Sequence, residues 1–104
     1  MTKIGFSIGL DDLNTDDSDI RDRIEKDLEC YENTIYTNMY YVVERSRHIV
    51  EWAIKHKTNL YISQSSSLML HDGPLTLTYK ICEEGTDKEI KIGFIFRKYI
   101  IDGV

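Results

Sequence analysis

The sequence predicts an α+β domain in which an antiparallel sheet of about four strands is backed on one face by two helices. Three observations predict this fold. Apolar residues alternate near the N-terminus, recur every three or four residues through the middle of the chain, and alternate again through the last third. The expected chain order is therefore β-α-α-β-β-β. A length of 104 residues suits a single domain, 1–104, with one hydrophobic core.

The first predicted strand is KIGFSIGL at 3–10. Its apolar face carries Ile4, Phe6, Ile8 and Leu10. Gly5 and Gly9 leave the opposite face nearly bare, and glycines in a strand often let another segment or a ligand approach closely. Either a neighbouring helix or loop covers this bare face, or the face contributes to a site.

A helical period begins at Ile20. Its apolar positions are spaced four, four, three and four residues apart, at Ile20, Ile24, Leu28, Tyr31 and Ile35. Asp17 or Ser18 is the expected N-cap, because a side-chain oxygen there accepts hydrogen bonds from the free N–H groups of the first turn. Neighbouring carboxylates suit the positive end of the helix dipole.

The next apolar stripe is also helical. It consists of Val42, Ser46, Ile49, Val50, Ala53 and Ile54. A single helix over residues 18–57 would be about 60 Å long. That exceeds the roughly 35 Å diameter expected for a domain of this size, unless the helix extended into a dimer. The segment ENTIYTN at 32–38 contains residues that form helices poorly, so we expect two helices with a break near Asn33–Asn38. A strand through Thr34–Val43 is the alternative.

The last third of the chain predicts three strands. LYISQ at 60–64 is short, whereas LTLTYKIC at 75–82 and EIKIGFIFRKYII at 89–101 alternate regularly. HDGP at 71–74 is a turn signal, and EEGTDK at 83–88 is expected to join the last two strands as a hairpin. Short connections favour antiparallel pairing of these neighbours.

The net charge of −5 is unevenly distributed. Residues 1–33 hold ten acidic and four basic side chains, a balance of −6, whereas residues 34–104 hold eight and nine, a balance of +1. An acidic face repels nucleic-acid phosphates and attracts basic surfaces. We therefore expect a basic protein surface as the partner, and no nucleic acid.

The stretch DDLNTDDSD at 11–19 places five aspartates directly after the first strand. As a calcium loop beginning at Asp12 it fails, because Asp17 stands where glycine is needed and Arg23 stands where a bidentate glutamate is needed. A zinc-binding H-E-x-x-H motif is also absent. We expect no metal and no cofactor.

The aspartates lead into further acidic residues along the first helix. We define the acidic ridge as Asp16, Asp17, Asp19, Asp22, Glu25, Glu29 and Glu32. The last four fall within an arc of about 80° opposite the apolar stripe. The ridge is either an ordinary solvated helix face or a docking surface for a basic partner.

Aromatic residues supply a second candidate surface. Trp52 lies at the edge of the second apolar stripe, where it either closes the core or is an exposed interface anchor beside Arg45. Tyr36, Tyr40 and Tyr41 cluster at the expected helix break. This cluster is a core edge, a dimer contact or a partner surface, and a homodimer through residues 34–43 is a further expectation.

The cysteines and the N-terminus indicate a cytoplasmic location. Cys30 and Cys82 are far apart and too few for a secreted disulfide framework, so both thiols are expected to be reduced. Residues 4–10 are too short and too interrupted by glycine for a signal peptide. No apolar run approaches the roughly 20 residues that span a bilayer, so no membrane partner is expected.

These observations favour a small acidic protein that acts by binding another protein, without catalysis. Inhibitors, immunity proteins, antitoxins and phage-encoded host-modulating proteins fit this description. The expected binding residues are those of the acidic ridge together with Tyr36, Tyr40 and Trp52, and no catalytic residue is expected. The alternative is a small dimeric enzyme or small-ligand-binding protein with its site between the first strand and the helices.

Overall fold

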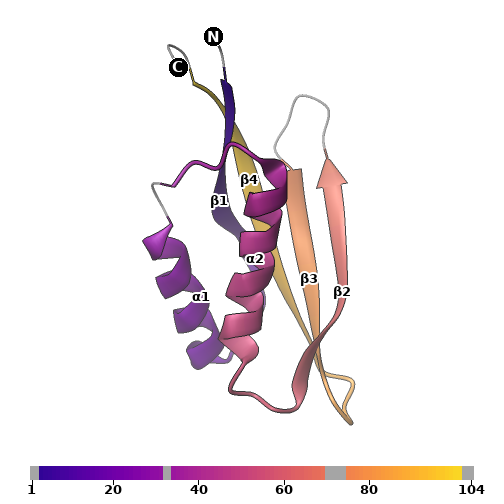
Figure 1. The fold of residues 1–104 in the computed structure, drawn as a ribbon. Helices are drawn as coiled ribbons and strands as arrows, with labels where there is room; N and C mark the ends of the chain where they lie inside the picture. The colour runs from indigo at the N-terminus through magenta and orange to yellow at the C-terminus, as the bar shows by residue number, and fades with distance from the viewer. Residues whose placement is uncertain (1–2, 32–33, 70–74, 102–104) are drawn as a thin grey trace.

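The predicted chain order and architecture are confirmed. The structure, a computed structural model, describes residues 3–31, 34–69 and 75–101. Four antiparallel strands form one sheet in the spatial order β1-β4-β3-β2, with the two helices on one face (Figure 1). The elements are β1 (Lys3–Leu13), α1 (Ser18–Cys30), α2 (Met39–Ile54), β2 (Leu60–Met69), β3 (Leu75–Glu83) and β4 (Glu89–Ile101). The first strand thus pairs with the last, and β1 and β2 are the two outer strands of the sheet.

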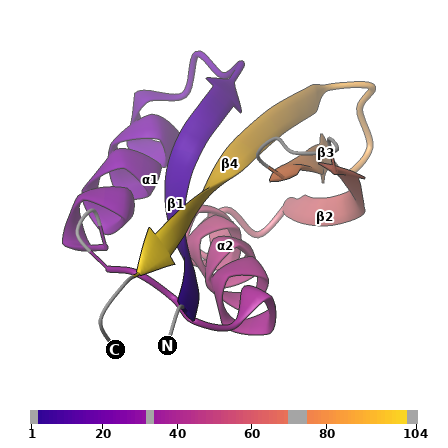
Figure 2. The ribbon, with the colours of Figure 1, turned by 90° about the horizontal axis from the view of Figure 1, so that it is seen from above.

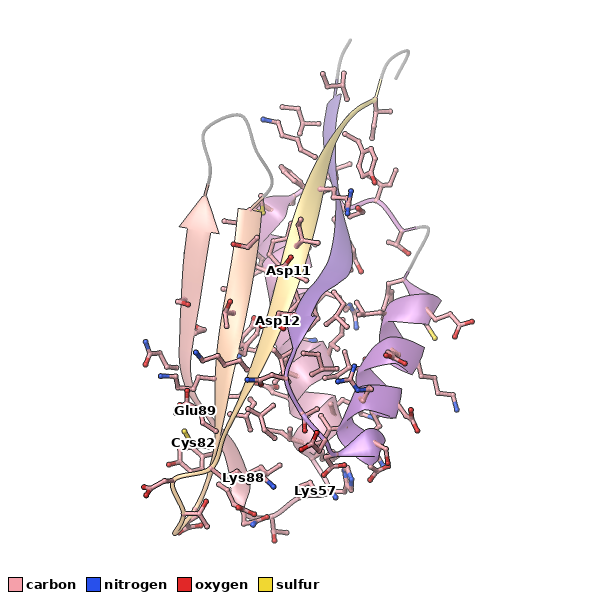
Figure 3. The ribbon with its side chains drawn as sticks, turned by 180° about the vertical axis from the view of Figure 1, so that it is seen from behind. Asp11, Asp12, Lys57, Cys82, Lys88 and Glu89 are labelled. Carbon is pink, nitrogen blue, oxygen red and sulfur yellow. The ribbon has the colours of Figure 1, made fainter. Side chains whose placement is uncertain are left out.

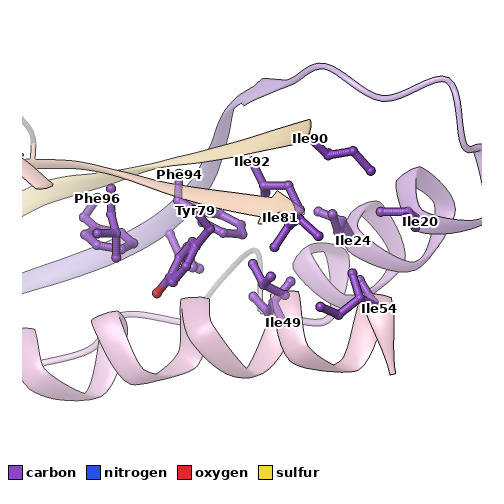
Figure 4. Close-up of a cluster of buried hydrophobic side chains, with 14 of the residues drawn as sticks. Ile20, Ile24, Ile49, Ile54, Tyr79, Ile81, Ile90, Ile92, Phe94 and Phe96 are labelled. Atoms are coloured by element: carbon purple, nitrogen blue, oxygen red, sulfur yellow. The ribbon is translucent and has the colours of Figure 1, made fainter. Parts of the chain in front are cut away.

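The core lies between the sheet and the helices (Figure 4). The sheet contributes alternate residues of β3 and β4, namely Leu77, Tyr79, Ile81, Ile90, Ile92, Phe94 and Phe96. The helices contribute mainly Ile20, Ile24, Val42, Ile49, Val50, Ala53 and Ile54. These are the apolar stripes that the two periods predict, because alternation places one strand face, and a 3.6-residue period one helix face, against the core.

One polar pair is buried within this core. Ser46 Oγ donates a hydrogen bond to the carbonyl of Val43 (2.6 Å) and lies 2.7 Å from the hydroxyl of Tyr79. Because the single hydroxyl proton of Ser46 is already used, the Tyr79 hydroxyl donates to Ser46. Burial raises the pKa of the Tyr79 phenol. Both buried hydroxyls have partners, which avoids the cost of about 1–3 kcal/mol for an unsatisfied buried group.

The chain between the helices runs along the free edge of β1. The two-helix prediction is confirmed, since α1 ends at Cys30 and α2 begins at Met39. In the connection, the N–H groups of Tyr36 and Phe6 donate to each other's carbonyls, both at 2.7 Å. Tyr36 therefore forms an isolated bridge, and the alternative of a strand through Thr34–Val43 is wrong because the helix starts within that segment.

The expectation that Ile35 continues the apolar stripe of the first helix is also wrong. Ile35 lies beyond α1, and a Cβ atom added at Gly5 would clash with its Cγ2. A loop thus covers part of the bare face of β1, one of the two expected outcomes. Gly5 and Gly9 both face away from the helices, since Gly9 lies against Ile95 on that side. The glycine-lined face is consequently on the opposite side of the sheet from the helices.

Both outer strands contain a bulge. The register of β1 shifts between Leu10 and Asp12, and that of β2 shifts between Ile62 and Gln64. Beyond its bulge β2 continues to Met69, so the strand predicted at 60–64 is longer than expected. The exposed serines of this stretch carry no apolar signal, and pairing with β3 holds them in the sheet. The turn predicted at 71–74 lies outside the described residues.

The hairpin predicted at 83–88 is present between β3 and β4. Its Gly85 has a φ angle of 80°, a conformation that side chains disfavour. The Glu83 N–H donates to the carbonyl of Lys88 (3.3 Å), which closes the turn. The glycine therefore marks the point where the chain reverses.

Candidate protein-binding surface

The first part of the acidic ridge is the N-cap of α1. The N–H groups of Asp19 and Ile20 donate to Asp17 Oδ1 at 3.0 and 3.2 Å, as predicted for a cap. Lys57 Nζ lies 3.4 Å from the other carboxylate oxygen. Burial acts to raise the pKa of Asp17, but the hydrogen bonds from Ile20 and Lys57 outweigh it. The pKa is therefore lowered from its ordinary 3.8.

Asp19 is also engaged within the molecule. Its Oδ2 lies 2.6 Å from His56 Nε2 and 3.9 Å from Lys57 Nζ, and its Oδ1 lies 4.0 Å from Arg23 Nε. His56 and Lys57 follow the end of α2, so these contacts join the start of α1 to the end of α2. Asp17 and Asp19 consequently serve the helix pairing, and Lys57 supplies a positive charge beside both carboxylates.

Replacing Asp17 with alanine is expected to lower the free energy of unfolding by about 1 kcal/mol near neutral pH, through loss of the cap. Because the pKa of Asp17 is lowered in the folded state, the ionised carboxylate stabilises the fold above its ordinary pKa of 3.8. That contribution is lost as the pH falls through the lowered value. Urea unfolding of the wild type and the Asp17→Ala variant, from neutral pH to values below 3.8, measures the difference in the free energy of unfolding. The exposed Asp16→Ala is the control, and equal, pH-independent losses in both variants would contradict the assignment.

The middle of the ridge has no internal partners. We define the unpaired ridge as Asp22, Glu25 and Glu29, all exposed on α1. Within the described part of the chain, none of these three carboxylates forms an ion pair or side-chain hydrogen bond. Glu32 lies outside the described residues. α1 packs beside β1 at one side of the molecule, so the unpaired ridge is open to a partner (Figure 2).

Two stacked cation–aromatic pairs connect the helices. The guanidinium of Arg23 lies 4.8 Å from the ring centre of Trp52, and that of Arg45 lies 4.3 Å from the ring centre of Tyr31. Trp52 is 43% exposed. It is therefore partly buried, between the two alternatives expected from the sequence, a closed core edge and an exposed interface anchor. Arg23 covers one face of the indole, which leaves the remainder for a partner. Such pairs contribute about 0.5–1 kcal/mol at exposed sites.

Two of the clustered tyrosines, Tyr36 and Tyr41, line a hollow at the start of α2, which we call the aromatic hollow. Its volume is about 340 Å³, and it is lined by Ile35, Tyr36, Thr37, Tyr41, Glu44, Arg45 and His48. Tyr40 is 65% exposed and packs edge-to-face on Tyr41, with ring centres 5.7 Å apart, but it is not part of the lining. Tyr36 is half-buried beside β1. The homodimer through residues 34–43 stays a prediction.

One exposed apolar group was missed in the sequence. Ile4 and Ile100 are paired across β1 and β4, and Ile100 is 70% exposed. The 13 residues of β4 extend about 44 Å, whereas the 16 residues of α2 extend about 24 Å. The end of the β1–β4 ribbon therefore projects past the helices (Figure 1). Comparing these two lengths in the sequence would have revealed it.

Comparison with known proteins adds no relative, since no protein-family model, curated protein sequence or solved structure matches the chain. Among the described residues, no group of three or more histidine, cysteine or carboxylate side chains is arranged to hold a metal ion. The helices of the described segments are too short or too polar to cross a bilayer.

Proposed function

We propose that this protein acts by binding a basic surface of another protein, in the manner of an inhibitor, immunity protein, antitoxin or phage host-modulating protein. The observation that carries the proposal is the unpaired ridge. Asp22, Glu25 and Glu29 stand three and four residues apart on one helix, where each meets the next across a turn. Each such like-charge contact costs about 0.2–0.5 kcal/mol, and a cationic partner would relieve it.

The contrast with the neighbouring charges supports this choice. Asp17 and Asp19 are matched by Lys57, His56 and Arg23 within a few ångströms. The unpaired ridge lies on the same helix without such matching, and Lys26, four residues after Asp22, forms no ion pair with it. A surface whose charges are left uncompensated steers an oppositely charged partner and accelerates its association.

The aromatic hollow supplies a complementary anchor close to the ridge. Arg45 lines the hollow and stacks on Tyr31, which caps α1 two residues after Glu29. Interfaces depend on a few buried aromatic or arginine anchors, whereas charges at the rim mainly set orientation and association rate. In the proposed complex the ridge directs the approach, and a side chain of the partner enters the hollow.

The test compares two variants of equal net charge as bait in the native host's extract. Glu25→Lys/Glu29→Lys alters the unpaired ridge, and Glu84→Lys/Asp87→Lys alters exposed acids in the β3–β4 hairpin. A basic protein retained by the wild type and by the hairpin variant, but lost from the ridge variant and from high-salt washes, is the expected result. Equal retention by all three proteins would refute the ridge as the binding surface.

A further inference from the structure

A second hollow lies on the face of the sheet that the helices leave open. It measures about 340 Å³ and is lined by polar side chains from all four strands, namely Asp12, Gln64, Ser66, Thr78, Lys80 and Lys91. Figure 3 shows this face, with Asp12 labelled in its middle. We call it the open-face hollow. It is separate from the unpaired ridge, which lies on α1.

The two bulges aim side chains into the open-face hollow. In a regular strand, residues two apart share a face, so Asp12 would follow Leu10 toward the helices. The bulge at Asp11 instead places Asp12 opposite Gly93, on the open face. The bulge in β2 does the same for Gln64, which would otherwise share the face of Ile62. Bulges of this kind re-aim side chains next to functional sites.

A glycine lies between two of the lining side chains. Gly93 is buried at the centre of the sheet, and a Cβ atom there would lie 3.4 Å from Asp12 Cβ and 3.6 Å from Thr78 Oγ1. A methyl group would thus fit without clashing, but it would fill the space between these side chains. Next to this glycine, Asn14 fixes the register of β1 against β4. Its Oδ1 accepts from the Lys91 N–H at 2.6 Å, and its N–H donates to the Lys91 carbonyl at 3.2 Å.

The lining combines both charges with neutral hydrogen-bonding groups. Lys80 lies 3.4 Å from Glu89 at the rim, whereas neither Lys91 nor Asp12 forms an ion pair with another described residue. The ammonium groups of Lys80 and Lys91 favour a ligand that carries an anionic group. The carboxylate of Asp12, which only accepts, favours a ligand hydroxyl, and the amide and hydroxyl side chains of the lining both donate and accept.

We propose that the open-face hollow binds a small hydroxylated anion, such as a sugar phosphate or a sugar acid. The anionic group lies between Lys80 and Lys91, and a hydroxyl group donates to Asp12. The volume is within the range of about 300–1,000 Å³ that small-molecule sites occupy. This site goes beyond the proposed protein-binding function and does not depend on it, because it uses a different face and different residues.

The test is a calorimetric titration of the full chain with four probes. Ribose 5-phosphate and glucuronate carry both features, ribose lacks the anion, and inorganic phosphate lacks the sugar hydroxyls. We expect one or both of the first two probes to bind at least tenfold more tightly than either fragment. Preference between them identifies a phosphate or a carboxylate as the anion. No binding of either, or equally tight binding of inorganic phosphate, would overturn the proposal.

Variants make the assignment specific. Lys91→Gln is expected to weaken binding of the hydroxylated anion at least tenfold. Lys55→Gln, which changes an exposed residue on the helix side, is expected to leave that affinity unchanged. Asp12→Ala should weaken binding of ribose 5-phosphate but tighten binding of inorganic phosphate, because it removes a hydroxyl acceptor and a repelling charge together. Gly93→Ala should weaken binding of both ligands by filling the space between Asp12 and Thr78. Circular dichroism checks that each variant folds, and an equal loss in Lys55→Gln and Lys91→Gln would contradict the site.

Discussion

Replacing Phe94 with alanine is expected to lower the free energy of unfolding by about 3–5 kcal/mol, the usual cost of deleting a buried aromatic ring. Phe94 is fully buried on β4, one of the two central strands. Its register partners on the neighbouring strands are Leu10 and Leu77, and its ring packs edge-on to Tyr79 with centres 6.0 Å apart. A domain of this size has only about 5–15 kcal/mol of stability, so the loss is a large fraction.

Urea unfolding followed by circular dichroism measures this loss. Phe94→Leu keeps most of the volume and is expected to cost less than about 1.5 kcal/mol. Tyr99→Ala removes an exposed aromatic ring from the same strand and should cost far less than Phe94→Ala. Similar losses for Phe94→Ala and Tyr99→Ala would mean that the core between sheet and helices is not where the structure places it.

Reversing the unpaired ridge is expected to slow association with the protein partner at least tenfold at low ionic strength. Glu25→Lys/Glu29→Lys exchanges two charges that attract the basic partner for two that repel it. The electrostatic field of the variant therefore no longer steers the partner toward the ridge. Both side chains are exposed, so the fold should be retained. Stopped-flow association with the purified partner, at several salt concentrations, gives the rates.

The salt dependence separates steering from a general loss of binding. Rates for the wild type and the ridge variant should converge as salt rises, because screening removes the field of exposed charges beyond about 10 Å at 0.1 M. Glu84→Lys/Asp87→Lys provides the control of equal net charge. An unchanged low-salt rate for the ridge variant would make the ridge a solvated face. The partner would then have to be recognised by the aromatic hollow and Trp52.

The regular elements were predictable because their signals are local. Alternation in β3 and β4 and the 3.6-residue period of α2 depend only on neighbouring residues, and each places its apolar side chains in the observed core. The cap at Asp17 is equally local, since its acceptors and donors lie within three residues. The same locality explains why ENTIYTN at 32–38 was recognised as a break.

The bulges could not be predicted from the sequence, because they interrupt the alternation of apolar and polar residues by which a strand is recognised. Leu10 and Leu13 both face the core, although three positions separate them, and only the pairing with β4 reveals Asp11 as the extra residue. The sequence therefore contains no pattern that predicts the open-face hollow. The side chains of Asp12 and Gln64 point to the open face only because of pairing partners far along the chain. Ile35 is similar, because contact with Gly5 decides its position.

Within the candidate protein-binding surface, composition alone could not separate paired from unpaired acids. Asp19 and Glu25 look equivalent in the sequence. The difference is that His56 and Lys57, 37 and 38 positions after Asp19, return to it at the end of α2. The acidic ridge was therefore predicted as one continuous surface, whereas the structure divides it into a helix-joining part and the unpaired ridge.

The most direct test of the protein-binding proposal is zero-length carbodiimide cross-linking of the complex, with the linked residues identified by mass spectrometry. Carbodiimide joins carboxylates to amines that touch, so each link names the carboxylate at the contact. Links between Asp17 and Lys57 serve as the internal control, because these groups lie 3.4 Å apart in the free protein. We expect links from Asp22, Glu25 or Glu29 to lysines of the partner, as the protein-binding proposal requires. Links to the partner only from carboxylates outside α1, with the internal link still present, would contradict it.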